Sequence, residues 1–302
     1  MIPAGKQICS GLVQRQLTFF NLAANIGIVI TGGAVRLTSS GLGCPTWPKC
    51  TKDSYHPTGE LGIHAVVEYS NRILSVIVGI VAALTVVALW RIAHRRLAVT
   101  ILGGVVLQGL VGGLTVRFDL SPYFVGPHFL FSMVLIALAY QLWRRTSPPP
   151  VDTEPRLRPL TVALTIVSAA VLVVGVVVTG SGPHAGDARA VRTGLDPEMI
   201  SQLHVDAVFL MVGLTVAYAL VARSTRRVAL VLLGILLAQG LIGFVQYFTG
   251  LPEILVGAHL AGACAVWVAT LRLWPATAPA QSPPAAPPEA KTAQTLELTA
   301  PR

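Results

Sequence analysis

The sequence predicts an all-α integral membrane protein with eight transmembrane helices. Of its 302 residues, 53% are hydrophobic and only 12% are charged, and the mean hydropathy is +0.69. The apolar residues gather in long runs, and a helix needs about 20 such residues to cross a bilayer. We expect the eight helices to form two four-helix bundles. An even number of helices in each half makes the two halves parallel, with a pseudo-twofold axis along the membrane normal.

The first apolar run ends in Gly32-Gly33-Ala34-Val35-Arg36, and no soluble domain follows it. We therefore expect it to be a retained helix and not a cleavable signal peptide. The predicted spans, with ends uncertain by a few residues, are 17–37, 63–90, 97–116, 124–143, 159–179, 201–222, 228–249 and 253–274.

The segments between the spans give the domain organisation. Residues 1–16 precede the first helix, and residues 144–158 form a basic, Pro-rich linker between the halves 17–143 and 159–274. The Pro/Ala-rich residues 275–302 are predicted to be a disordered tail.

The net charge of +9 comes from basic residues scattered over short loops, which argues against nucleic-acid binding. The loops after the second, fourth and sixth spans carry ten Lys and Arg residues, and the loops on the other side carry six. Because cytoplasmic loops are enriched in Lys and Arg, we expect both termini to be cytoplasmic in this multi-pass protein.

One segment occurs twice. Gln108 begins Gln-Gly-Leu-Val-Gly-Gly and is followed twenty residues later by His128, and Gln239 begins Gln-Gly-Leu-Ile-Gly-Phe and is followed at the same interval by His259. The two copies lie 131 residues apart. Gene duplication explains this spacing better than chance recurrence of Gly-rich helix packing. Similar Gly-rich segments also begin at Thr31 and Thr179.

Histidine is costly inside a bilayer, so His128, His204 and His259 are candidate functional residues. Each follows, by six or seven residues, a proline suited to a first helical turn: Pro122, Pro197 and Pro252. The three side chains should therefore lie about 10 Å into their helices, at one depth near the outer leaflet. Imidazole is well suited to holding a haem iron between helices. The alternatives are core histidines bonded to backbone carbonyls and, with less support, a zinc site.

Cys44 and Cys50 share the first outer loop, where a disulfide is expected because that side of the membrane tolerates disulfides. Two free thiols or a metal clip are the alternatives.

Four motifs resemble those of haem A synthases, and the resemblance covers roughly residues 17–274. They are GGAVRLTSSGLGCPTWPKC (32–50), EYSNR (68–72), TGSGPHAGD (179–187) and QLH (202–204). The overall form is similar to actinobacterial members of that family.

The resemblance implies an enzyme of the bacterial plasma membrane. It would oxidise the C8 methyl of haem O to a formyl group by successive hydroxylations and loss of water, making haem A for cytochrome c oxidase. It also implies a haem b cofactor in the C-terminal half, ligated by His204 and His259, and substrate haem in the N-terminal half, ligated by His128. By the same resemblance Glu68 is the catalytic glutamate, and Cys44 and Cys50 match the family's loop cysteine pair.

The sequence departs from the family at Asn71, where the family motif has a histidine. His64 lies seven residues earlier, on the same helical face and about 10 Å further out, with Glu68 between them. Either His64 replaces the missing ligand or His128 alone holds the substrate iron. His64 has two other possible roles. It could act next to Glu68, in proton transfer or in a propionate contact, or it could be a structural histidine at the interface.

Glu68 also has a simpler interpretation, as a solvated carboxylate or one paired with Arg72 at i,i+4. Arg36, Arg72 and Arg117 lie near the outer interface, where they suit either haem propionates or membrane anchoring.

The sequence thus predicts a haem A synthase. The alternatives are a non-catalytic haem b membrane cytochrome for electron transfer and a haem transporter or chaperone. The expected partners are haem O, haem O synthase, an electron donor that the sequence does not identify, the lipid bilayer and, as a candidate, a second copy of the chain.

Overall fold

The computed structural model describes residues 4–92, 94–150, 152–184 and 186–277. Within these ranges all regular structure is helical, and eight helices are long and apolar enough to cross a membrane, which confirms the predicted fold class. The long helices are α1 (Ala4–Leu37), α2 (Gly62–Leu89), α3 (Arg95–Arg117), α4 (Pro122–Arg145), α5 (Arg158–Ser181), α6 (Pro197–Val221), α7 (Arg226–Phe248) and α8 (Glu253–Leu271). Three short helices complete the set: η1 (Gly59–Leu61), η2 (Pro155–Leu157) and α9 (Leu273–Ala276).

Most helix ends lie within a few residues of the predicted spans, and three details differ from the sequence prediction. Helix α1 begins at Ala4 and not near residue 17, because polar residues at the membrane surface do not stop a helix. Pro252 is the N-cap of α8 and not a first-turn residue, whereas Pro122 and Pro197 do begin α4 and α6. Helix α9 occupies the first residues of the predicted tail. The rest of that tail, 278–302, lies outside the described residues.

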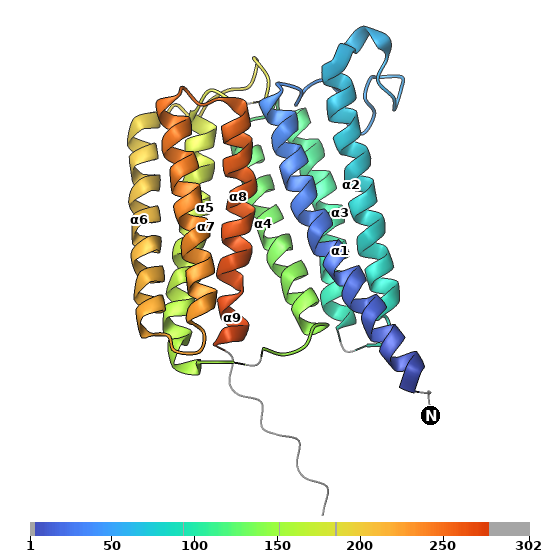
Figure 1. The fold of residues 1–302 in the computed structure, drawn as a ribbon. Coiled ribbons are helices and arrows are strands. Elements are labelled where there is room, and N and C mark those ends of the chain that lie inside the picture. The colour runs from blue at the N-terminus through green and yellow to red at the C-terminus, as the bar shows by residue number, and fades with distance from the viewer. Residues whose placement is uncertain (1–3, 93, 151, 185, 278–302) are drawn as a thin grey trace, which may run out of the picture.

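Consecutive helices pack against each other in two groups (Figure 1). Helices α1 to α4 contact one another in turn, with α4 returning to α1, and α5 to α8 do the same with α8 returning to α5. The groups meet where α1 packs on α8 and where α4 packs on α5 and α8. The start of α1 and helix α9 lie at one end of the bundle, and the loop from α1 to α2 lies at the other. The pseudo-twofold relation between the groups stays a prediction.

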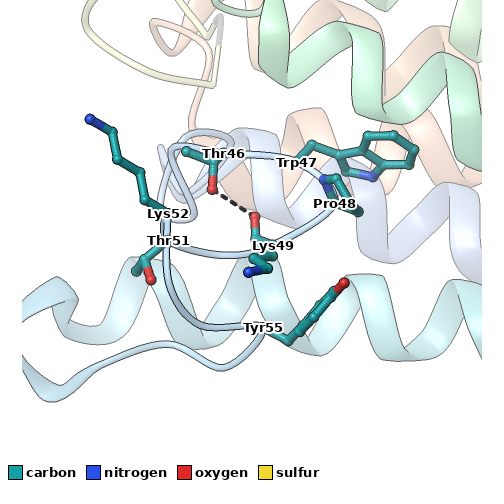
Figure 2. Close-up of a pocket in the computed structure, with 7 residues that line it drawn as sticks. All are labelled: Thr46, Trp47, Pro48, Lys49, Thr51, Lys52 and Tyr55. Atoms are coloured by element: carbon teal, nitrogen blue, oxygen red, sulfur yellow. Dashed lines mark hydrogen bonds between the residues drawn. The ribbon is translucent and has the colours of Figure 1, made fainter.

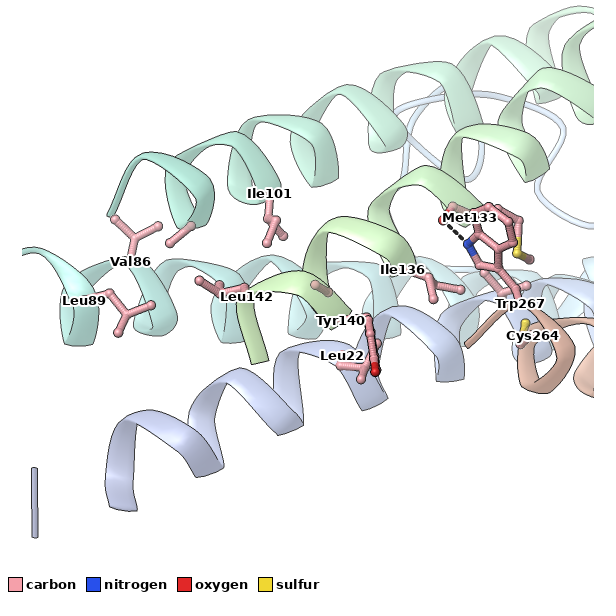
Figure 3. Close-up of a cluster of buried hydrophobic side chains, with 13 residues drawn as sticks. Leu22, Val86, Leu89, Ile101, Met133, Ile136, Tyr140, Leu142, Cys264 and Trp267 are labelled. Atoms are coloured by element: carbon pink, nitrogen blue, oxygen red, sulfur yellow. Dashed lines mark hydrogen bonds between the residues drawn. The ribbon is translucent and has the colours of Figure 1, made fainter. Parts of the chain in front are cut away.

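A buried apolar cluster holds α1 to α4 and α8 together (Figure 3). The Trp267 indole of α8 reaches into this cluster and donates to the Met133 carbonyl of α4 at 2.9 Å. This hydrogen bond satisfies the polar atom of a large buried side chain, as such side chains require. A second cluster, around Leu164, Met211 and Tyr218, fills the group α5 to α8.

The segment between α4 and α5 is anchored by a buried carboxylate. Glu154 accepts the backbone N–H groups of Arg223 (2.8 Å) and Thr225 (2.9 Å) in the turn between α6 and α7, and it pairs with Arg156 at 2.9 Å. The N–H of Thr225 is the main reason that the pKa of Glu154 falls from 4.5 to about 2, with help from Arg156 and Arg223. Hydrogen bonds to Glu154 therefore attach the predicted linker to the second helix group.

Candidate functional site

Two of the predicted histidines face each other in the second helix group. His204 is the eighth residue of α6 and His259 the seventh of α8, and their ring centroids lie 6.4 Å apart with the ring planes at 70°. Both side chains are half-buried. Because a metal–imidazole bond is about 2 Å long, this separation leaves room for one metal atom between the two rings.

Glycines on the neighbouring helices make space for these rings. A Cβ atom at Gly175 of α5 would lie 3.1 Å from His204 Cε1, and one at Gly243 of α7 would lie 3.4 Å from His259 Cε1. The first distance is tighter than side chains ordinarily tolerate, so only glycine leaves the His204 ring undisturbed. All four helices α5 to α8 therefore contribute to the setting of the histidine pair.

The ring nitrogens of this pair suit axial ligation of a haem. Nδ1 of His204 and of His259 is buried and makes no hydrogen bond of ordinary geometry to a described residue. The backbone carbonyls of Val171 and Gln239 nevertheless lie close enough to act on the two rings. A ligating histidine usually donates its second N–H to such a carbonyl, and these two carbonyls are the candidates for that role. The residues present therefore fit a haem held by two histidines.

His128 has a comparable setting on α4 in the first helix group. It is the seventh residue of its helix, and a Cβ atom at Gly112 of α3 would lie 3.3 Å from its Cε1. The Gln108 amide donates to the His128 carbonyl at 2.8 Å and also to the Ser132 hydroxyl. The repeated Gln-to-His segment thus joins α3 to α4, as Gln239 on α7 lies against Gly262 of α8 in the other copy.

No second histidine ring contacts His128 among the residues that the structure describes. Asn71 of α2, where the resemblance led us to expect a histidine, is bound by the Thr31 hydroxyl of α1, which donates to Asn71 Oδ1 at 2.8 Å. His64 is exposed, and its Nδ1 lies 3.0 Å from the Ser40 hydroxyl in the loop between α1 and α2. The structure therefore pairs two histidines in the second group and leaves His128 without a facing histidine among the described residues of the first group.

Glu68 is buried and both of its carboxylate oxygens have partners. Arg72 Nη2 lies 2.5 Å from Oε1, and the Cys44 backbone N–H donates to Oε2 at 2.6 Å. Arg72 also donates to the carbonyls of Cys44 and Lys49, each at 3.2 Å. The Glu68–Arg72 pair at i,i+4 is thus present, and it fixes Arg72 to the loop. These bonds offset the cost of burying a charge.

The loop that this pair holds is closed by a disulfide between Cys44 and Cys50, as predicted. Gly43 packs directly on the backbone of His64 and Ala65, where a Cβ atom would collide. The sequence did not reveal this attachment, although a glycine immediately before the cysteine is the signal that could have indicated a close backbone approach.

The tip of the disulfide loop covers the end of α3. A small pocket in this loop is lined by residues between Thr46 and Tyr55. Figure 2 shows Trp47 projecting away from the other residues of that pocket, and its indole packs on Gly113 of α3. Gly113 follows Gly112, the residue that faces His128. Thr46 stiffens the tip by donating to the Lys49 carbonyl at 2.8 Å (Figure 2). The loop thus links Glu68 to the end of α3 next to the His128 setting.

Arg36, near the end of α1, joins the two helix groups on the side of the disulfide loop. Its Nη2 donates to the Thr179 carbonyl of α5 at 2.7 Å. Its Nε is buried and makes no hydrogen bond to a described residue. Three arginines were considered for propionate binding. Arg36 has a buried N–H without a partner among the described residues, whereas the guanidinium of Arg72 is hydrogen-bonded to Glu68 and the loop. Arg117 is exposed.

Comparisons with known proteins match the chain to one family. A family model described as cytochrome oxidase assembly protein, COX15-CtaA, matches residues 15–191. A protein named heme A synthase from Halalkalibacterium halodurans is 33% identical over 134 residues, which are 41% of this chain and 44% of that protein. Its namesake from Geobacillus kaustophilus is 30% identical over 184 residues, covering 55% and 57% of the two chains.

A more distant heme A synthase, from Sinorhizobium fredii, is 24% identical over 317 aligned positions, covering 84% of this chain and 86% of that protein. The chain spans about half the length of the first two curated relatives described above. The family model includes Glu68 and His128 and ends before α6, so the His204–His259 pair lies beyond the matched residues. Because the model covers more than half of the sequence, the chain belongs to the COX15-CtaA family of cytochrome oxidase assembly proteins.

Proposed function

We propose that this protein is a haem A synthase of the bacterial plasma membrane, with both termini cytoplasmic. It oxidises the C8 methyl of haem O to a formyl group and so makes haem A for cytochrome c oxidase. Membership of the family and the names of the related proteins, heme A synthase, support this proposal. The observation that carries it is the inequality of the two halves, with a histidine pair in one and a single histidine in the other.

The second half is the cofactor half. His204 and His259 hold haem b, with Gly175 and Gly243 giving the rings room. When bound, haem b supplies one-electron redox chemistry. Two ligands from two packed helices suit a group that stays in the protein through many turnovers.

The first half binds haem O as substrate. His128 is its ligand, and the amide of Asn71 stands where a second histidine would make binding tighter. A single ligand suits a haem that must enter, react and leave. His64, bonded to Ser40, positions the outer loop and does not ligate iron.

Glu68 is the catalytic carboxylate of this half. It lies on the same face of α2 as Asn71, one turn nearer the outer end. A carboxylate there accepts protons released when the substrate methyl is oxidised. Arg72 keeps it oriented by two hydrogen bonds, from Nε at 3.2 Å and from Nη2 at 2.5 Å. Arg36, with its unused Nε, is positioned to contact a haem propionate.

Product analysis tests the proposed function. The full chain is coexpressed with a haem O synthase, and extracted haems are separated by chromatography. We expect haem A and its hydroxylated precursor, and neither with the His128→Ala variant. Haem O alone, in membranes that contain folded protein with bound haem, would contradict the enzyme proposal. That result would leave a non-catalytic haem b cytochrome or a haem carrier.

A further inference from the structure

A cleft lies between α1, α4 and α8, where the two helix groups meet. Its volume is about 680 Å³, and one wall is a stripe of α1 that runs from Phe19 to Ile30. Eleven residues of helix rise about 16 Å, which is about the thickness of one leaflet of the hydrocarbon core. Apart from its polar end, the cleft is lined by apolar residues, among them Ala23 and Gly27.

Polar groups gather at the end of the cleft where α4 and α8 finish. Tyr140, Arg144 and Arg272 line it there, and both guanidinium groups lie close enough to act electrostatically on the Tyr140 hydroxyl. Figure 3 shows Tyr140 next to Leu22 of α1, which also lines the cleft. This end lies opposite the disulfide loop and on the same side as the start of α1 (Figure 1).

The two arginines have hydrogen-bond donors that no described carboxylate uses. Arg144 Nη2 donates to the Pro148 carbonyl at 3.2 Å, but its Nε is buried and makes no hydrogen bond to a described residue. Neither Arg144 nor Arg272 forms a salt bridge with any carboxylate in the described part of the chain. A buried guanidinium N–H without a partner is costly, and an anionic oxygen acceptor would remove that cost.

We propose that this cleft is a binding site for one anionic phospholipid. The phosphate binds between Arg144 and Arg272, next to the Tyr140 hydroxyl, and one acyl chain lies along the Ala23–Ile30 face of α1. Basic pockets between transmembrane helices hold such headgroups. The apolar wall, one leaflet long, matches an acyl chain, and the two cations match its phosphate. This site is separate from the histidine sites and does not rest on the proposed function.

Lipid retention by the purified full chain tests the proposal. The protein is incubated in detergent with phosphatidylglycerol or with phosphatidylcholine, and bound lipid is counted by native mass spectrometry. We expect one phosphatidylglycerol retained, with at least about tenfold preference over phosphatidylcholine. Both lipids carry the phosphate, but the choline cation of phosphatidylcholine is repelled by the two arginines, and a tenfold preference corresponds to about 1.4 kcal/mol. The double variant Arg144→Gln/Arg272→Gln should lose that preference. Arg145→Gln is the matched control, because Arg145 is exposed next to Arg144 and does not line the cleft.

A second variant tests the acyl-chain part of the site. A Cβ atom at Gly27 would meet nothing within 4 Å, so Gly27→Leu should fill the cleft without disturbing the fold. We expect this variant to retain neither lipid while its thermal stability stays equal or rises, because leucine favours a helix more than glycine does. Equal retention of the two headgroups by the wild type, unchanged retention in either variant, or recovery of a neutral isoprenoid quinone in place of phospholipid would each overturn the proposal.

Discussion

The Glu68 carboxylate accepts a hydrogen bond from the backbone N–H of Cys44 at 2.6 Å, so the only buried carboxylate of α2 is tied to the first residue of the disulfide loop. The same carboxylate is paired with Arg72, which reaches two further carbonyls of that loop. A single residue therefore combines the proposed proton transfer with the position of the loop over the first half.

Replacing Glu68 separates these two roles. Glu68→Gln keeps an acceptor for the Cys44 N–H and loses the charge, so we expect product formation to fall at least about 100-fold while haem stays bound. Glu68→Ala loses the acceptor as well, which leaves a buried N–H unpaired at a cost of about 1–3 kcal/mol. Only the alanine variant should make the loop sensitive to proteolysis. Normal turnover by the glutamine variant would remove the catalytic role.

Bulk added at Gly243 should expel the cofactor. Gly243→Val places methyl groups against His259, and overpacking of this kind costs about 1–3 kcal/mol, so bound haem b should fall about tenfold or more. Gly240→Val is the matched control, because it lies on the same helix and a Cβ atom there meets nothing within 4 Å. Haem content is measured by absorbance of the purified proteins. An equal loss in both variants would show that the Gly243–His259 contact is not the cause.

The repeated segment gives a parallel pair in the first half. Gly112→Val should crowd His128 and reduce haem O binding and product yield about tenfold, whereas Gly109→Val, which meets open space, should not. Product yield and retained haem O are measured by chromatography of extracted haems. Wild-type yield from Gly112→Val would contradict the placement of the substrate at His128.

Asn71→His should make the two halves more alike. The new imidazole would supply a second ligand opposite His128, and the Thr31–Asn71 hydrogen bond is lost. We expect haem in the first half to be retained about 10–100-fold more tightly and turnover to fall, because the product leaves slowly. The readouts are the low-spin absorbance and the dissociation rate of haem O. Unchanged retention would mean that Asn71 does not face the substrate.

Glu154 predicts how stability changes with pH. Its pKa falls from 4.5 to about 2 on folding, so its contribution to stability is fully present above pH 4.5 and is lost as the pH falls toward 2. Glu154→Gln should lower the unfolding free energy by about 2 kcal/mol at pH 7. That difference should shrink as the pH falls below 4.5. Thermal melts of both proteins across this range check it, and a gap that stays constant would contradict the assignment.

Hydropathy was sufficient to predict the eight spans, because the bilayer imposes both the length and the apolar character of each helix. It did not predict the start of α1 at Ala4, since hydropathy marks the membrane and not the end of the hydrogen-bonded helix. The positions of His128, His204 and His259 within their helices were predictable because proline marks or immediately precedes each helix start.

The contacts between distant segments could not be predicted in the same way. The Thr31–Asn71, Cys44–Glu68 and Glu154–Thr225 bonds join residues 40, 24 and 71 positions apart. None of these pairs follows a helical or loop periodicity, so their formation depends on how the helices pack. The pairing of His204 and His259 was implied by the family resemblance and by their common depth, but the glycines that give them room were visible only in the structure.

The central claim is that His204 and His259 hold the retained haem and that His128 does not. The absorbance spectrum of haem in the purified His204→Ala, His259→Ala and His128→Ala variants tests it most directly. We predict that the first two lose the low-spin haem b spectrum and that His128→Ala keeps it. A low-spin spectrum that survives in both His204→Ala and His259→Ala, or that disappears only in His128→Ala, would contradict the claim.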